Sequence, residues 1–168
     1  MKKTLIALME DKPGVLDRVA SLFRRRNFNI ESMSVGHSET QGISRMTLVI
    51  DCKDETQEEQ VVKQFHKLVE VLKVIEADEP EAVLYRELAL IKISANFETR
   101  PHIIQLVDIF RAQVIDVSGS SLTIEITGTE TKVDSLIELL RPFGIKELAR
   151  TGRVAMLRSA NGKQPNGK

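Results

Sequence analysis

The chain has 168 residues, of which 42% are hydrophobic, so its length fits one or two small domains with real cores. Lysine plus arginine and aspartate plus glutamate both number 24, and aromatic residues make up only 4% of the chain. A basic surface for nucleic acid and an aromatic platform for stacked bases are therefore disfavoured. Cys52 is the only cysteine, which excludes an intrachain disulfide and a cysteine-based metal site.

The first half of the chain alternates strand and helix patterns. Residues 4–10 form an apolar run typical of a buried strand. The next segment predicts a helix whose inward stripe is Leu16, Val19, Ala20 and Phe23. Two strands over 29–39 and 43–52 follow, and acidic residues then open a second helix, where the helix dipole favours them. That helix has the inward stripe Val61, Phe65 and Leu68, and a strand over 69–77 completes the order βαββαβ.

The second half repeats this order. Strand patterns cover residues 87–95, 113–119, 121–128 and 145–157, and helix patterns cover 100–112 and 130–144. The sequence therefore predicts an α+β fold of two consecutive ferredoxin-like βαββαβ modules. Each module is expected to be an antiparallel sheet with both helices on one face. The other face would stay partly open, which makes self-association plausible.

The predicted domain boundaries follow the composition of the chain. A first domain is expected over residues 1–78, and the acidic, proline-containing segment after it predicts a linker over 79–86. A second domain is expected over 87–158, and the polar residues 159–168 are expected to be a disordered tail. The apolar run near the N-terminus is too short for a signal peptide, and no stretch approaches membrane-spanning length. We therefore expect a cytoplasmic location.

Residues able to carry enzymatic chemistry form no recognisable motif. His37, His66 and His102 are scattered without ligand spacing, which indicates ordinary surface positions and no metal site. No phosphate loop, nucleophile elbow or dinucleotide-binding motif occurs. Glu58–Glu59 sit at a helix start, where carboxylates suit the dipole. Arg24–Arg26 indicate a solvated helix end or, alternatively, a docking patch for an acidic partner.

The segment from Asp11 to Gly14 is the best candidate for a binding site. The first turn of a helix has free N–H groups and a partial positive charge, so it can hold a carboxylate or phosphate. Gly14 lets a ligand approach the backbone, Pro13 stiffens the turn, and Asp11 can accept hydrogen bonds from an ammonium group. Together they predict a site for the carboxylate and amine of an amino acid. The alternative is that Asp11 only caps the helix and Pro13–Gly14 only turns the chain.

A family resemblance supports the binding interpretation. The segment EDKPGVLDRVASLF, followed by NFNIESMSVG, resembles the opening of an ACT domain, the amino-acid-sensing version of the ferredoxin-like fold. Six segments then resemble, in order, the regulatory (small) subunit family of acetolactate synthase: NIESMSVG, SRMTLVI, HKLVEVLKV, RELALIKI, IFRAQVIDV and LARTGRVAMLR. They extend over nearly the whole chain, so the resemblance implies an ACT domain followed by a second ACT-like domain.

The resemblance implies a chain with no catalytic centre of its own. Its expected partner is a catalytic large subunit that carries thiamine diphosphate, magnesium and FAD and condenses pyruvate with a second 2-oxo acid. This reaction is the first common step toward valine, leucine and isoleucine. The small subunit is expected to raise its partner's activity and to confer feedback inhibition, typically by valine, and to hold no cofactor or metal itself. The alternative is an ACT-domain sensor that serves a different amino-acid biosynthetic enzyme.

The resemblance also implies where the effector binds. In the family, the site lies in a homodimer, where the loop before the first helix of one chain meets the second strand of the other. The implied residues of this sequence are Asp11, Gly14, Val15, Leu16, Asn29, Ile30 and Gly36. Backbone N–H groups of residues 14–16 would bind the carboxylate, while Asn29 would offer its amide and Ile30 would contact the branched side chain. Several family members have asparagine at the position of Asp11, where a carboxylate attracts an ammonium group but repels a nearby carboxylate.

Two rival classes share the predicted fold. An acylphosphatase-like enzyme would bind phosphate at the same helix N-terminus, but it needs an arginine in the first loop. Residues 10–12 of this chain are Glu, Asp and Lys. An RNA-binding module needs exposed aromatic residues on its central strands, and the segments 4–10 and 44–50 contain none. Both classes are disfavoured. The second half has no comparable Pro–Gly turn before its first helix, so we expect it to contact a partner or support a dimer.

Overall fold

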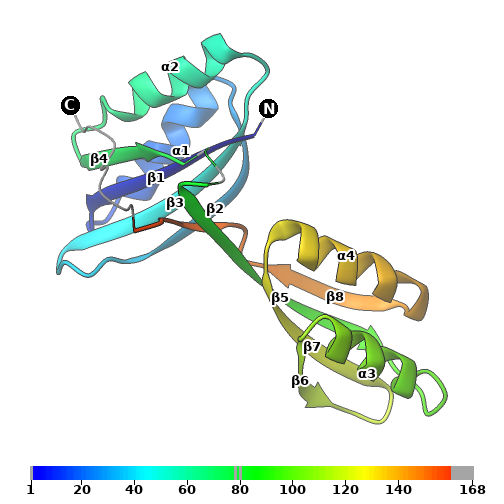
Figure 1. The fold of residues 1–168 in the computed structure, drawn as a ribbon. Coiled ribbons are helices and arrows are strands. Elements are labelled where there is room, and N and C mark those ends of the chain that lie inside the picture. Colours follow the sequence, from blue (N-terminus) through cyan, green and yellow to red (C-terminus); the bar gives the residue numbers. More distant parts are fainter. Residues whose placement is uncertain (1, 78, 80, 160–168) are drawn as a thin grey trace. The chain divides into compact units, whose positions relative to one another are not determined.

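The computed structural model describes residues 2–77, 79 and 81–159, which form two compact units (Figure 1). The first unit holds the described residues up to Leu84 together with those from Arg153 onward, and the second unit is Tyr85–Gly152. Each unit has an antiparallel sheet with two helices on one face, which confirms the two predicted βαββαβ modules. In the part of the chain described, no helix is long and apolar enough to cross a membrane.

The first unit begins with the predicted order of elements. They are β1 (Lys2–Glu10), α1 (Val15–Arg25), β2 (Asn29–His37), β3 (Ile43–Asp51), α2 (Glu55–Phe65) and β4 (Val71–Glu76). The sheet order is β2-β3-β1-β4, and each neighbouring pair is antiparallel. Strand β2 therefore lies at an edge of the sheet.

The core of the first unit lies between the sheet and its two helices. Alternate residues of β1 and β3 are buried there: Leu5, Ala7, Met9, Met46, Leu48 and Ile50. Phe23 of α1 and Phe65 of α2 meet edge to face, with their ring centroids 5.6 Å apart. Aromatic pairs of this geometry contribute about 0.5–1.5 kcal/mol beyond the area they bury. The contact fixes the two helices against each other over the sheet.

Helix α1 buries a different stripe from the predicted one. Val15, Val19 and Phe23 are buried, whereas Leu16 is 48% exposed and Ala20 is exposed as well. The prediction that Leu16 and Ala20 face the core is therefore wrong. The helix begins at residue 15, after a glycine in a left-handed conformation with φ 86°, and its packing on the sheet buries Val15 and not Leu16.

Helix α2 begins with a side-chain cap. Oδ1 of Asp54 accepts a hydrogen bond from the N–H of Gln57 at 2.8 Å, which satisfies one free donor of the first turn. We expect Asp54→Ala to lower the free energy of unfolding by about 1 kcal/mol in a urea titration. Glu59→Ala on the same helix is the control, because it breaks only an exposed ion pair with Lys63 and should cost less than about 0.5 kcal/mol. Equal losses would show that the cap does not stabilise the helix.

The second unit repeats the topology of the first. Its elements are β5 (Val83–Ser94), α3 (Arg100–Ile109), β6 (Gln113–Val117), β7 (Ser121–Gly128), α4 (Glu130–Leu140), a short 3-10 helix (Arg141–Phe143) and β8 (Ile145–Arg150). The sheet order β6-β7-β5-β8 matches that of the first sheet. Ile103 and Val107 of α3 are buried, while Leu106 and Phe110 are partly buried against the same core.

Strand β5 begins earlier than predicted. The linker is expected over 79–86, but the strand starts at Val83, so the last four residues of that range belong to a strand. Arg158 explains this start, because its N–H donates to the carbonyl of Ala82 at 2.8 Å, next to the point where β9 (Val154–Leu157) pairs with β5. Arg158 therefore holds the residue just before β5.

The last strand pattern forms two strands. Strand β8 ends at Arg150, Gly152 takes a left-handed φ of 72°, and β9 follows. The prediction of one strand over 145–157 is wrong, because an extended chain cannot run through a residue with positive φ. Since β9 belongs to the first unit, the second unit ends at residue 152 and not at the expected residue 158. Apart from residue 159, the predicted tail lies outside the described residues.

Candidate functional site

The loop between β1 and α1 presents an uncapped helix N-terminus. Gly14 is the N-cap residue of α1, and no side chain caps the helix. The N–H of Val15 donates to the carbonyl of Lys12 at 3.4 Å, so it is used within the turn. Over the ranges that the structure describes, the N–H groups of Gly14, Leu16 and Asp17 have no hydrogen-bond partner. These three groups, together with the helix dipole, are therefore available to a small anion.

Asp11 is held in place by the loop and by β2. Its N–H donates to the carbonyl of Gly42 at 2.9 Å, and its Oδ2 lies 3.2 Å from Nδ1 of His37. The alternative in which Asp11 only caps the helix is wrong, because its carboxylate points to His37 and the cap position belongs to Gly14. The sequence predicts only an ordinary surface position for His37, whereas the structure brings its imidazole next to Asp11 in the candidate site.

The expected site residues lie at opposite ends of β2. Asn29 begins this strand and His37 ends it, and eight residue steps correspond to about 26 Å along a strand. Because His37 contacts the loop before α1, Gly14 and Gly36 lie at the same end of the sheet. Asn29 and Ile30 lie at the other end. The expected site residues therefore form two candidate half-sites in one copy of the chain, with Gly36 in the half that contains the loop.

The surface around both half-sites is open. Asn29 and Gly36 are exposed, Ile30 is half-buried, and Val35 of the same strand is 38% exposed. Leu16, at the start of α1, adds a second exposed apolar side chain. Edge strands present unpaired backbone groups, and apolar side chains beside them are typical of a surface that another chain covers.

The charges beside the loop are paired with each other. Nζ of Lys12 donates to the carboxylate of Glu10 at 2.8 Å, and this hydrogen bond raises the pKa of Lys12. Arg18, one turn into α1, forms an ion pair with Glu70. The positive field available to a ligand carboxylate therefore comes from the helix N-terminus, while Asp11 supplies the negative charge for an ammonium group.

The corresponding loop of the second unit is closed. Oδ1 of Asn96 accepts hydrogen bonds from the N–H groups of Glu98 at 3.0 Å and Thr99 at 2.8 Å. The side chain of Arg100, the first residue of α3, donates through Nη2 to the carbonyl of Ser118 at 2.6 Å. Side chains of the unit itself therefore occupy the region before α3, and the open helix N-terminus belongs to the first unit.

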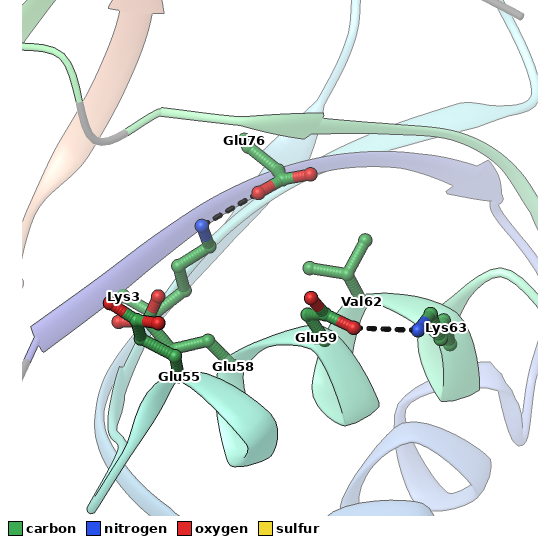
Figure 2. Close-up of a pocket in the computed structure, with 7 residues that line it drawn as sticks. All are labelled: Lys3, Glu55, Glu58, Glu59, Val62, Lys63 and Glu76. Atoms are coloured by element: carbon green, nitrogen blue, oxygen red, sulfur yellow. Dashed lines mark hydrogen bonds and ion pairs between the residues drawn. The ribbon is translucent and has the colours of Figure 1, made fainter.

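A hollow in the first unit lies between α2 and the sheet (Figure 2). It has a volume of about 370 Å³ and is lined by Lys3, Glu55, Glu58, Glu59, Val62, Lys63 and Glu76. Figure 2 shows Lys3 pointing to Glu76 and Lys63 pointing to Glu59. The two N–O distances are 2.6 Å and 2.7 Å, and the hydrogen bond from Lys63 lowers the pKa of Glu59. Four glutamates against two lysines disfavour the carboxylate of an amino acid here. Across the described residues, no three His, Cys, Asp or Glu side chains group to hold a metal ion.

The geometry defines the class of this protein. A βαββαβ module with an open helix N-terminus after its first strand and a free edge strand is the architecture of an ACT domain, and the second unit has the same strand order. Residues 5–73 match the family described as the AHAS small subunit-like ACT domain. Residues 86–159 match the small subunit of acetolactate synthase, which disfavours a sensor for a different enzyme.

Relatives narrow the class to one family. The acetolactate synthase small subunit of Mycobacterium bovis is 51% identical over 95% of this chain and 94% of its own length. The one from Bacillus subtilis is 43% identical over 100% of this chain and 97% of its own. The crystal structure of the small subunit from Thermotoga maritima, at 47% identity, covers 94% of this chain and 98% of its own with a TM-score of 0.88. The chain belongs to the acetolactate synthase small-subunit family.

Proposed function

We propose that this chain raises the activity of the catalytic large subunit of acetolactate synthase and confers feedback inhibition by valine. Membership of the small-subunit family supports the partnership with a large subunit. The large subunit would carry thiamine diphosphate, magnesium and FAD, and this chain would contribute regulation without a catalytic centre of its own. The proposed location is the cytoplasm, where the thiol of Cys52, buried in the first core, would stay reduced.

The observation that carries this proposal is the open helix N-terminus beside Asp11. The carboxylate of L-valine would accept hydrogen bonds from the N–H groups of Gly14 and Leu16. Its ammonium group would bind Asp11, whose Oδ1 stays available because Oδ2 faces His37. In this arrangement the ammonium group of the ligand lies between Asp11 and the ligand carboxylate, so the two negative charges stay apart.

A second copy of the chain would complete the site. The two half-sites lie about 26 Å apart on β2, so a single copy cannot close around a small ligand. In an antiparallel pair of edge strands, the first residue of one lies near the last residue of the other. A two-fold axis near the middle of β2 would therefore bring Asn29 of the partner subunit to the loop that His37 contacts. Ile30 of the partner subunit would then contact the branched side chain.

Calorimetric titration of L-valine, with L-leucine and L-isoleucine alongside, tests the effector role. We expect saturable binding with one site per chain or one per two chains, and only modest discrimination, since one methylene changes binding by about 1–3 kcal/mol. Activation is tested separately by adding the chain to the large subunit, whose rate should rise. If none of the three amino acids binds with the large subunit present, the proposed effector role is wrong. If the rate of the large subunit is unchanged, the proposed activating role is wrong.

A further inference from the structure

The helix-free face of the first sheet is covered by β9. Four residues of β1 and β3 on this face are each at most 3% exposed: Thr4, Ile6, Thr47 and Val49. No helix of the first unit lies on this side, and β9, drawn in red-orange, runs along it instead (Figure 1). Ala155 of β9 is 1% exposed. We call the segment Arg153–Leu157 the strap.

Side chains of the sheet hold the strap through hydrogen bonds. Oγ1 of Thr47 accepts from the N–H of Ala155 at 3.2 Å, and Nη2 of Arg45 donates to the carbonyl of Ala155 at 3.1 Å. Nη1 of Arg153 donates to Oγ1 of Thr4 at 3.3 Å. Both backbone polar groups of Ala155 are therefore satisfied by side chains of β3. Loss of either partner would leave a buried polar group of Ala155 without a hydrogen bond, which would destabilise this position of the strap.

Arg45 links the strap to the candidate effector site. Arg45 pairs directly with Gly36 of β2 in the sheet, and Gly36 lies at the end of β2 that contacts the loop before α1. Among the described residues, Nε of Arg45 is buried without a hydrogen-bond partner, so the bond to Ala155 is the one that orients the guanidinium. A shift of β2 at Gly36 would therefore move Arg45 and the strap with it.

The other end of the strap continues directly into the second unit. Thr151 is fixed there, because its N–H donates to the carbonyl of Leu88 at 3.0 Å and its Oγ1 accepts from the N–H of Leu88 at 3.1 Å. Only Gly152 separates Thr151 from Arg153. The strap is thus joined to the second unit through Gly152 and Thr151, in addition to the pairing of β9 with β5.

We propose that the strap couples the effector site to the second unit, with Arg45 as the positioning residue that connects them. Occupation of the site would bias β2 and β3, and the strap would carry the change along the chain to the second unit. This rests on the proposed function, from which the effector site is taken. Releasing the strap should therefore leave L-valine binding in place while uncoupling it from inhibition of the large subunit.

Thr47→Val is the test variant, because it keeps the size and branching of the side chain and removes the acceptor for Ala155. Thr123→Val is the matched control. Thr123 occupies the helix-free face of β7, the strand that corresponds to β3, and within the described residues its side chain makes no hydrogen bond. A double variant, Arg45→Met with Thr47→Val, removes both side-chain partners of Ala155.

Hydrogen exchange, calorimetry and inhibition are measured on the complex with the large subunit. The peptide containing Ala155 should exchange about 10-fold faster in Thr47→Val than in the wild type and in Thr123→Val. The Kd for L-valine should stay within about 2-fold of the wild type, while the inhibition reached at saturating L-valine should fall to less than about half. Faster exchange together with full inhibition would overturn the coupling.

Two further outcomes also decide the matter. Unchanged exchange in the double variant would show that these bonds do not hold the strap, which overturns the proposal. If the wild type neither binds nor responds to L-valine, the proposed effector role fails instead. In that case, a coupling role of the strap is supported only if the double variant changes activation of the large subunit by more than about 2-fold while Thr123→Val does not. Unchanged activation in that case would overturn it.

Discussion

Gly14→Asp is expected to abolish feedback inhibition by L-valine while the fold and the activation of the large subunit persist. A Cβ at Gly14 meets no atom within 4 Å, so the side chain fits. The φ of 86° costs about 1–2 kcal/mol for a residue with a Cβ, and aspartate and asparagine tolerate it better than most. The added carboxylate would sit at the helix N-terminus, where it would occupy the anion position and repel the effector.

Calorimetry and inhibition assays measure this effect. The Kd for L-valine should rise more than about 10-fold in Gly14→Asp, which corresponds to more than about 1.4 kcal/mol. Gly14→Asn is the matched control, since it has the same shape and the same backbone cost but no charge, and it should retain most of the inhibition. Wild-type inhibition in Gly14→Asp, or an equal loss in Gly14→Asn, would show that the effector carboxylate does not bind at this helix N-terminus.

Arg150→Met is expected to lower the free energy of unfolding by about 3 kcal/mol. Nη2 of Arg150 contacts the carboxylate of Glu87, whose side chain is 3% exposed, and Nη1 donates to Asp134 at 2.7 Å. Burial lowers the pKa of Arg150, but its hydrogen bonds with Glu87 and Asp134 outweigh burial and raise the pKa above its usual value. Methionine would leave a buried carboxylate without its cation, which costs about 3–5 kcal/mol, and the partly exposed guanidinium places the loss at the lower end.

Lys92→Met provides the control for this prediction. Lys92 and Glu147 form an ion pair of 3.0 Å between the same two strands, β5 and β8, but their side chains are 39% and 72% exposed. Breaking an exposed pair costs less than about 1 kcal/mol, because water screens both charges. Urea titrations of the two variants compare the pairs directly. A loss in Arg150→Met no larger than that in Lys92→Met would show that the buried pair does not stabilise the attachment of β8.

Local patterns determined much of the fold. The repeated order of strands and helices was predicted because apolar spacing of two or of three to four residues is set within each segment. The loop before α1 was predicted for the same reason, since Pro13 and Gly14 constrain the backbone at their own positions. The sequence also indicated Asn29 and Ile30 through a family resemblance, although their role in the effector site stays a prediction.

Local patterns did not determine which residue of a stripe is buried or which distant segments meet. Whether Val15 or Leu16 faces the core depended on how α1 packs on the sheet, and the separation of Asn29 from the loop depended on the course of β2 along the sheet edge. The strap depended on contacts between residues more than one hundred positions apart, such as Thr47 and Ala155. Burial of a whole sheet face selects such contacts, because the free energy gained is shared by many residues and no single segment encodes it. The sequence by itself therefore determined two modules and one candidate loop, while tertiary packing decided that β9 completes the first module.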